Sequence, residues 1–374
     1  MKRMIKKIIT ILNGIIRKIL FCIIERRLPF RSLRGVSLVN PEWYRGLEQG
    51  LKITSKIKVG FGPVISGEDD LHVRKWRIDP IVNRINEISK KYSAGIFLTV
   101  SDMAKFDIVV MVRGIDEINF FLIDNLKKNH KKIIYDIVDR PYLKGYATDY
   151  EKLYDFLRHV DALIASNPLQ VEELNGVIKN IFFIEHPLLN SLRKDYTKPN
   201  NRLIRLIWQG FAENQKHMEI IHPIIKKLIQ ELKKEIHIIY LTNLLPKKND
   251  FVEFKTWSVR NWERTLIESD IAVENKVLDD PLLQRKPSTK IVSYMAAGLP
   301  VVCTPSAADK LVIEHGRTGF FAYTEEDWYH YLKTLILNGE LRRQIGEAAR
   351  SYVINNFNIH NITQKYLDCF DRII

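Results

Sequence analysis

Apolar runs of strand length alternate with amphipathic, helix-like stretches over the first half of the chain. The strand-like runs lie at residues 56–61, 96–100, 106–112, 132–138, 161–165 and 179–184. Apolar residues at helical spacing lie between them, at residues 79–91, 117–128, 149–159 and 168–174. Buried strands that alternate with helices indicate a parallel sheet covered on both faces. Residues 35–195 are therefore predicted to form a Rossmann-like, doubly wound α/β domain.

The same alternation returns after residues 190–202, a polar stretch without periodicity that we interpret as an interdomain linker. Strand-like runs follow at residues 203–208, 236–241, 252–257, 270–273 and 301–303. Helical patterns lie at residues 217–234, 290–297, 307–315, 325–338, 340–357 and 360–374. Gly298 and Gly339 are expected just past helix ends, where glycine is common. A second Rossmann-like domain is therefore predicted over residues 196–355, followed by a C-terminal helix at 356–374.

The N-terminal segment has a different pattern. Apolar residues at positions 5, 8, 9, 12, 16, 19, 20 and 23 follow helical spacing, and the longest uncharged run, Ile8 to Ile16, has nine residues. A membrane-spanning helix needs about 20 apolar residues. We therefore expect residues 1–34 to form an amphipathic helix that lies on an anionic membrane surface rather than crossing it. The alternative is a helix packed on the protein's own core.

Charge and cysteine content narrow the function classes. Residues 1–34 hold ten Lys and Arg and one Glu, so +9 of the total net charge of +14 belongs to this segment. Nucleic-acid binders more often spread basic residues over a folded face, so a nucleic-acid partner is not expected. Three unclustered cysteines predict neither a disulfide framework nor a zinc site, which suits a reducing compartment. The expected location is cytoplasmic, peripheral on the inner face of the membrane.

The stretch from Arg285 to Thr304 carries the clearest candidate chemistry. A basic, proline-containing loop leads into a short helix with good N-cap residues at Ser288 and Thr289, and a strand follows. The N–H groups at a helix N-terminus, together with Arg285, Lys286 and Lys290, would hold an anion such as a phosphate. The alternative is an ordinary loop–helix–strand unit with solvated lysines.

Here the sequence resembles a known family. Residues 290–302, K-I-V-S-Y-M-A-A-G-L-P-V-V, resemble the C-terminal donor-site motif of the retaining GT-B glycosyltransferases often called family 4. Residues 314–321 and 341–353 resemble the same family. The family usually carries two glutamates at the positions of Arg285 and Ser293. The pattern K-x-S-x-K at residues 286–290 resembles the replacement found in some branches of the fold.

The resemblance implies the GT-B fold, in which two Rossmann-like domains face a cleft and the last helix crosses back onto the first domain. It implies a glycosyltransferase that moves a sugar from a nucleotide-diphosphate sugar to a saccharide or lipid-linked saccharide acceptor in cell-surface polysaccharide synthesis. Neither a metal nor a cofactor is expected, because cationic side chains already lie where a divalent ion would be needed. In the retaining family the donor phosphate itself can take the acceptor proton.

The candidate site residues come from strand–helix junctions. Asp139 follows a strand of the first domain and is a candidate acceptor contact, or the base if the enzyme inverts; capping the next turn is the alternative. Lys216 and Lys290 match basic positions of the family and are expected to hold the donor diphosphate, with both side chains exposed in the empty cleft. The full set of candidate donor-binding residues is Gly62, Gly210, Asn214, Lys216, Glu274, Arg285, Lys286, Ser288, Thr289, Lys290 and Ser293.

Two other functions remain open from the sequence. A nucleotide-sugar epimerase shares the fold and would also bind a diphosphate, but it needs acid and base carboxylates in the cleft. A non-catalytic, membrane-bound module of a polysaccharide assembly is the second, because the usual glutamate pair is absent.

Overall fold

The computed structural model of the 374-residue chain describes residues 56–62, 73–97, 100–113, 117–147, 150–188, 203–243, 251–258, 261–277 and 279–374. The predicted amphipathic helix at the N-terminus and the linker at 190–202 lie outside these residues.

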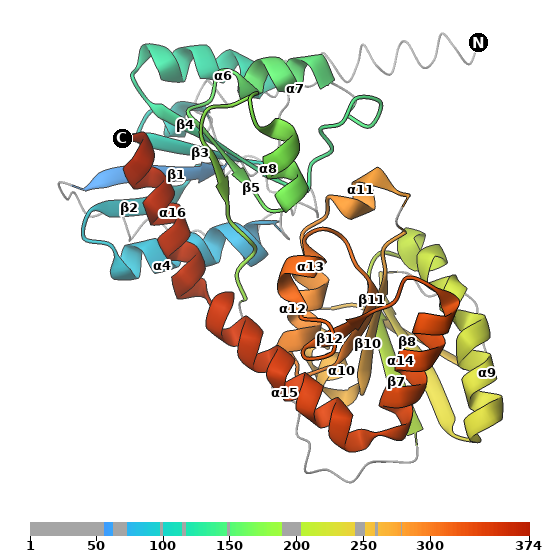
Figure 1. Cartoon of the computed structure of the whole chain (residues 1–374). Helices are drawn as coiled ribbons and strands as arrows, with labels where there is room; N and C mark the ends of the chain where they lie inside the picture. Colours follow the sequence, from blue (N-terminus) through green and yellow to red (C-terminus); the bar gives the residue numbers. More distant parts are fainter. Residues whose placement is uncertain are drawn as a thin grey trace, which may run out of the picture.

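The first domain is built on a parallel sheet of six described strands (Figure 1). The strands are β1 (Ile57–Gly62), β2 (Tyr92–Ile96), β3 (Ile108–Val112), β4 (Lys132–Val138), β5 (Ala162–Ala165) and β6 (Ile181–Phe183), in the spatial order β2-β1-β3-β4-β5-β6. The helical segments are a π-helical turn (Arg74–Ile78), α4 (Asp79–Ile88), α5 (Val100–Met103), α6 (Glu117–Lys128), α7 (Tyr150–Leu157) and α8 (Pro168–Leu174). All strand pairs are parallel, as the buried apolar runs predict.

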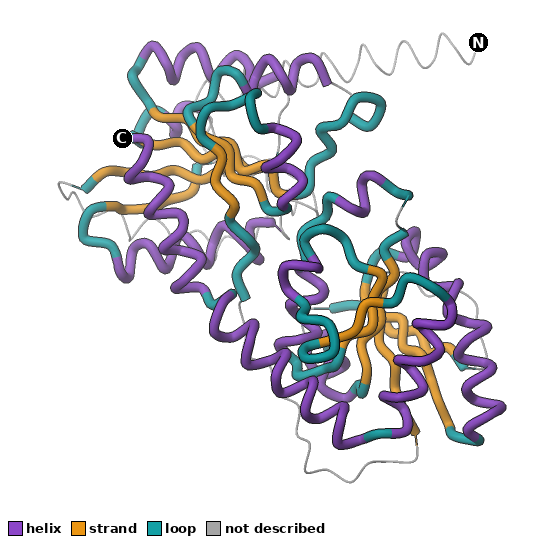
Figure 2. The backbone as a smooth tube through the Cα atoms, in the orientation of Figure 1, coloured by secondary structure: helices purple, strands orange, loops and turns teal. Residues whose placement is uncertain are grey.

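The second domain repeats this architecture. Its strands are β7 (Leu203–Gln209), β8 (Glu235–Thr242), β9 (Val252–Thr256), β10 (Ile271–Asn275), β11 (Val301–Thr304) and β12 (Gly319–Phe321), in the order β12-β11-β10-β7-β8-β9. The helices are a 3₁₀ helix (Ala212–Ile221), α9 (His222–Leu232), α10 (Trp262–Glu268), α11 (Pro281–Gln284), α12 (Thr289–Ala296), α13 (Asp309–Val312), α14 (Glu325–Leu337) and α15 (Gly339–Asn356). Figure 2 shows the two sheets as separate groups of strands, each with helices packed around it.

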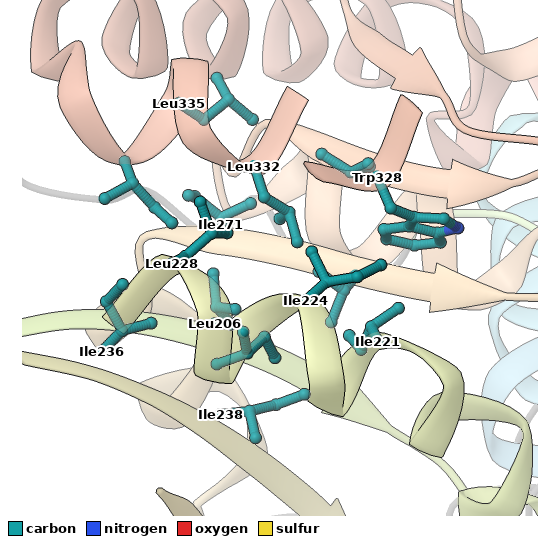
Figure 3. Packing of buried hydrophobic residues seen from close by; sticks show 14 of the residues in the cluster. Leu206, Ile221, Ile224, Leu228, Ile236, Ile238, Ile271, Trp328, Leu332 and Leu335 are labelled. Atoms are coloured by element: carbon teal, nitrogen blue, oxygen red, sulfur yellow. The ribbon is translucent and has the colours of Figure 1, made fainter. Parts of the chain in front are cut away.

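The core of the second domain forms where α9 and α14 cover one face of its sheet. Leu206, Ile238 and Ile271 of the strands contact Leu228 of α9 and Leu332 of α14, and all five side chains are buried (Figure 3). Burying each such side chain contributes about 1.5–3 kcal/mol. This face fixes the strands whose carboxyl ends form the site.

The end of the chain joins the domains. α15 packs on α12 of the second domain, and α16 (Ile359–Ile373) packs on α4 of the first (Figure 1). The Tyr366 hydroxyl donates to Asp136 Oδ2 at 2.7 Å, and Arg77 Nε donates to the same oxygen at 2.7 Å. All three side chains are buried, so α16 is anchored in the first domain by a polar network as well as by apolar contacts.

Two predicted elements have different limits. The strand predicted at 96–100 is β2, at Tyr92–Ile96, and a short helix begins at Val100. The strand was predicted too far along the chain because residues 96–100 are mostly apolar. The observed strand β2 lies at the sheet edge, and its Gly95 packs against the Phe106 ring. The helix predicted at 217–234 is a 3₁₀ helix followed by α9, which begins at His222. Pro223, which lacks an N–H, favours a new helix start there.

Two glycines were expected past helix ends, and one predicted helix is shorter than expected. Gly339 follows α14, whose C-cap is Asn338, and it also begins α15, so the prediction that it lies past a helix end is confirmed. Asn338 caps α15 by accepting a hydrogen bond from Leu341 N at 2.9 Å. The helix predicted at 307–315 is confined to Asp309–Val312, and its first residue, Asp309, accepts hydrogen bonds from Ser306 N at 2.8 Å and Ser306 Oγ at 2.9 Å ahead of the helix. Gly298 lies past the end of α12 with φ +81°, which confirms the prediction for this glycine.

Candidate active site

A cleft of about 1460 Å³ lies between the domains, and the carboxyl ends of strands from both sheets line it. Asp139 and His186 follow strands of the first sheet, whereas Gln209 and Glu274 end strands of the second. Open parallel sheets bind their ligands at these ends. The wall includes nine of the predicted site residues: Asp139, Gly210, Asn214, Glu274, Lys286, Ser288, Thr289, Lys290 and Ser293.

Lys290 lies in the first turn of α12 and contacts Glu274 at the end of β10. Lys290 Nζ is 2.6 Å from Glu274 Oε1 and 5.1 Å from the centre of the Trp208 ring. The Lys290 side chain is 32% exposed and that of Glu274 is 4% exposed. The prediction of an exposed Lys290 was therefore wrong. Burial lowers the pKa of Lys290, Glu274 opposes this shift, and the charges of Lys276 and Lys286 lower the pKa further.

The N-terminus of α12 faces the cleft, but Ser288 does not cap it with its side chain. Ser288 occupies the N-cap position, and its hydroxyl donates to Asp309 Oδ1 at 2.7 Å. The expectation that this side chain caps the helix was wrong, because a buried carboxylate competes for the hydroxyl. Ser293 Oγ donates to Thr289 O at 2.8 Å within the helix. The first-turn N–H groups of α12 are thus not capped by the Ser288 side chain.

Gly210 follows β7 in the cleft wall, beside the Trp208 ring that Lys290 also approaches. A Cβ atom at this position would lie 2.5 Å from the Trp208 ring, so a side chain would require the ring under Lys290 to move. Lys216, six residues later, is exposed on the 3₁₀ helix and is not among the described residues that line the cleft. Its neighbour His217 does line the cleft, and burial and the Lys216 charge lower the pKa of His217.

Arg285 faces the other domain. Its Nε donates to Glu173 Oε2 of α8 at 2.8 Å, and its Nη1 donates to Pro281 O at 2.7 Å. Asn167, at the N-cap of α8, donates to Gln284 O at 3.1 Å and to Lys286 O at 3.0 Å. Arg285 is absent from the described cleft wall, and its side chain is bound to Glu173 and Pro281 rather than directed to the donor site. The loop before α12 is instead fastened to α8.

Asp139 directly follows β4, where the backbone is strained. Arg113 and Val138 have φ values of +59° and +53°, which non-glycine residues rarely adopt. Hydrogen bonds from Ser166 Oγ at 2.6 Å and Gln170 Nε2 at 2.8 Å hold the Val138 carbonyl. Asp139 then contacts two cations, Arg113 Nε at 3.2 Å and Lys286 Nζ at 3.5 Å. A strained turn thus aims this carboxylate across the cleft at the loop before α12.

Gly62 ends β1 away from this wall. A Cβ atom there would lie 2.4 Å from the Phe97 carbonyl oxygen, so close packing of the backbone requires glycine. Gly62 is not among the described residues of the cleft wall, and its role as a donor contact stays a prediction. Sequence reasoning also missed Lys276 and His186, although each follows a strand-like run directly.

Within the described residues, we find no helix long and apolar enough to cross a membrane. The same residues hold no group of three or more His, Cys, Asp or Glu side chains arranged to bind a metal ion.

Comparisons with known proteins identify the fold. No family model matches the sequence, and no curated protein matches it either. Among solved structures, Anabaena HepE in complex with UDP and glucose matches with a TM-score of 0.63 and 10% identity, over 84% of this chain and 99% of HepE. Sucrose-phosphate synthase from Thermosynechococcus elongatus matches with a TM-score of 0.61 and 10% identity, over 85% and 99% of the two chains. A glycosyltransferase from Rickettsia africae matches with a TM-score of 0.59 and 15% identity, over 86% and 99%. The chain has the GT-B fold.

Proposed function

We propose that this chain, which has the GT-B fold, is a glycosyltransferase that moves a sugar from a nucleotide-diphosphate donor to a saccharide or lipid-linked saccharide. Synthesis of a cell-surface polysaccharide is the proposed context. One observation supports this function above the others: the N-terminus of α12 and the ammonium group of Lys290 lie together in the wall of the interdomain cleft. Both favour an anion at the same place.

The donor would leave its diphosphate at the N-terminus of α12. Negative charge grows on the leaving oxygen as the glycosidic bond breaks, and fixed N–H groups and cations stabilise that charge. Lys290 and Lys286 provide the cations, and Gly210, which has no side chain, would let the donor approach the backbone in the same wall. Glu274 Oε2 is buried without a hydrogen-bond partner among the described residues. It would accept a hydrogen bond from a hydroxyl group of the bound nucleotide sugar.

We propose that the reaction is retaining and independent of metal ions and cofactors. In such a reaction the donor phosphate takes the proton of the acceptor hydroxyl, so no protein base is required. Asp139, held by Arg113 and Lys286, would orient the acceptor from the first domain. The lysines and the helix N-terminus supply the positive charge that a divalent ion would otherwise provide.

The structural comparisons indicate which nucleotide donors to test first. Solved structures of HepE contain UDP or UDP-glucose, and these are the first ligands that we propose to test on this chain. We further propose that the basic residues 1–34 place the cleft at the inner face of the membrane, where a lipid-linked acceptor would be reached.

Thermal shift with UDP, GDP, dTDP and ADP sugars, followed by product analysis with the labelled donor that binds, tests the proposal. A labelled sugar transferred to saccharide or lipid supports a glycosyltransferase. An altered sugar still joined to its nucleotide would show an epimerase instead. Absence of binding to every nucleotide would favour the non-catalytic module and contradict the proposal.

A further inference from the structure

A second lysine, Lys276, lies in the cleft wall directly after β10. Only 4% of the residue is exposed. Its Nζ is 2.7 Å from Asp309 Oδ2, 2.9 Å from Asp309 Oδ1 and 3.1 Å from Ser306 Oγ. An ammonium group has three N–H donors, and the two oxygens of one carboxylate lie too close together to take a separate donor each at a good angle. Asp309 and Ser306 therefore occupy two of the donors, and the third has no other acceptor among the described residues.

The carboxylate that holds Lys276 already has several other donors. Asp309 is fully buried and accepts hydrogen bonds from Ser288 Oγ at 2.7 Å, Ser306 N at 2.8 Å and Ser306 Oγ at 2.9 Å. Burial alone would raise the pKa of Asp309, but Lys276 and these donors bring it below the ordinary value. These donors and Lys276 keep the buried Asp309 carboxylate ionised, so Asp309 holds the Lys276 ammonium group in a fixed place in the cleft wall.

Lys276 also lies beside the predicted phosphate site. Asp309 Oδ1 contacts both Lys276 Nζ, at 2.9 Å, and the hydroxyl of Ser288, the N-cap residue of α12. Burial is the largest cause that lowers the pKa of Lys290, and the positive charges of Lys276 and Lys286 lower it further. Three cations therefore repel one another around the N-terminus of α12, and an anion bound among them would relieve that repulsion.

We propose that Lys276 binds the donor diphosphate as a further, buried cation beside the N-terminus of α12. This inference rests on the proposed function, because it names a further residue of the same site. Asp309 acts as the counter-ion that keeps the Lys276 ammonium in place. A pair that served folding alone would tolerate neutral replacement without any change in ligand affinity.

The test is calorimetric titration of UDP and of uridine into the full chain and its variants. Lys276→Met should weaken UDP binding by about 10- to 150-fold, as expected for a lost charged hydrogen bond, and leave uridine binding unchanged. The double variant Lys276→Met/Asp309→Asn removes both charges, so it keeps the fold if the single variant does not, and it should show the same loss. Lys310→Met, an exposed neighbour of Asp309, is the matched control and should bind UDP as the unmodified chain does.

The two proposals fail in different ways. Wild-type affinity for UDP in the folded double variant would overturn the role of Lys276 and leave the proposed function standing. If the unmodified chain bound neither UDP nor the other nucleoside diphosphates, both proposals would be overturned.

Discussion

Lys290 contacts the buried carboxylate of Glu274 on one side and the open cleft on the other. Lys290→Ala should weaken binding of the nucleoside diphosphate by about 10- to 150-fold, with little effect on the nucleoside. The same change leaves the Glu274 carboxylate buried without its cation, so the free energy of unfolding should fall by about 1–3 kcal/mol. Titration calorimetry and urea denaturation measure the two effects.

The double variant Lys290→Ala/Glu274→Gln separates these effects. It removes the unpaired charge, so it should regain much of the stability while the diphosphate stays weakly bound. Unchanged diphosphate affinity in Lys290→Ala would mean that α12 is only a structural helix.

His186, in the cleft wall, makes the stability of the folded chain depend on pH. Burial and the nearby Arg77 charge lower the pKa of His186 well below 6.5, and its Nε2 is buried without a partner among the described residues. The unfolded chain therefore takes up a proton near pH 6.5 that the folded chain does not, so stability should fall as the pH drops below about 6.5. His186→Gln should make this fall less steep between pH 6.5 and 5 in urea denaturation. His330→Gln, an exposed control, should match the unmodified chain, and an equal slope in both variants would refute the assignment.

Some site residues were predictable and others were not, for reasons visible at single positions. Thr289 and Lys290 follow a basic loop and begin a helix, a local pattern that the sequence displays in full. Arg285 was misassigned because its partner Glu173 lies 112 residues away in the other domain. The ion pair between Lys290 and Glu274 was likewise hidden, because only the pairing of β10 with its neighbours places Glu274 beneath α12.

At the level of elements, the buried hydroxyl of Tyr366 helps to anchor α16 in the first domain. The Tyr366 hydroxyl donates to Asp136 Oδ2, whose carboxylate is buried beside Arg77. Tyr366→Phe removes this donor from a buried charge, so the free energy of unfolding should fall by about 1–3 kcal/mol in urea denaturation. Gln364→Ala, on the exposed face of the same helix, should change it by less than about 0.5 kcal/mol. Equal effects of the two changes would mean that the network does not anchor α16.

The elements that were predicted well have strong local signals. β4 was predicted at its observed limits, because residues 132–138 form one apolar run that ends in a charged turn. β2 was displaced, because an edge strand containing Ser93, Ala94 and Gly95 has little apolar periodicity. The break between the 3₁₀ helix and α9 could have been found at Pro223, which does not continue a helix.

For the whole molecule, hydrophobic periodicity predicted two α/β domains, and the family resemblance implied that they face a cleft and that the last helix crosses back onto the first domain. The packing of α16 on α4 agrees with that expectation. The contacts of Asn167 and Arg285 with the opposite domain join residues far apart in the chain. Hydrophobic periodicity carries no information about such pairs, because it reports only which face of an element is buried. The residues that meet between the domains therefore required the structure.

The N-terminal segment carries a prediction for the whole chain. Because residues 1–34 hold +9 of net charge, the full chain should co-sediment with vesicles of anionic lipid, and binding should weaken at high salt. Deletion of residues 1–28 should abolish it. Binding that resists both high salt and alkaline carbonate would contradict peripheral attachment.

The central claim is that a nucleotide-diphosphate donor binds with its diphosphate at the N-terminus of α12. A crystal structure of the chain with bound UDP tests it most directly. We expect the diphosphate within hydrogen-bond distance of the first N–H groups of α12 and of Lys290 Nζ. A diphosphate bound anywhere else on the molecule would contradict the claim.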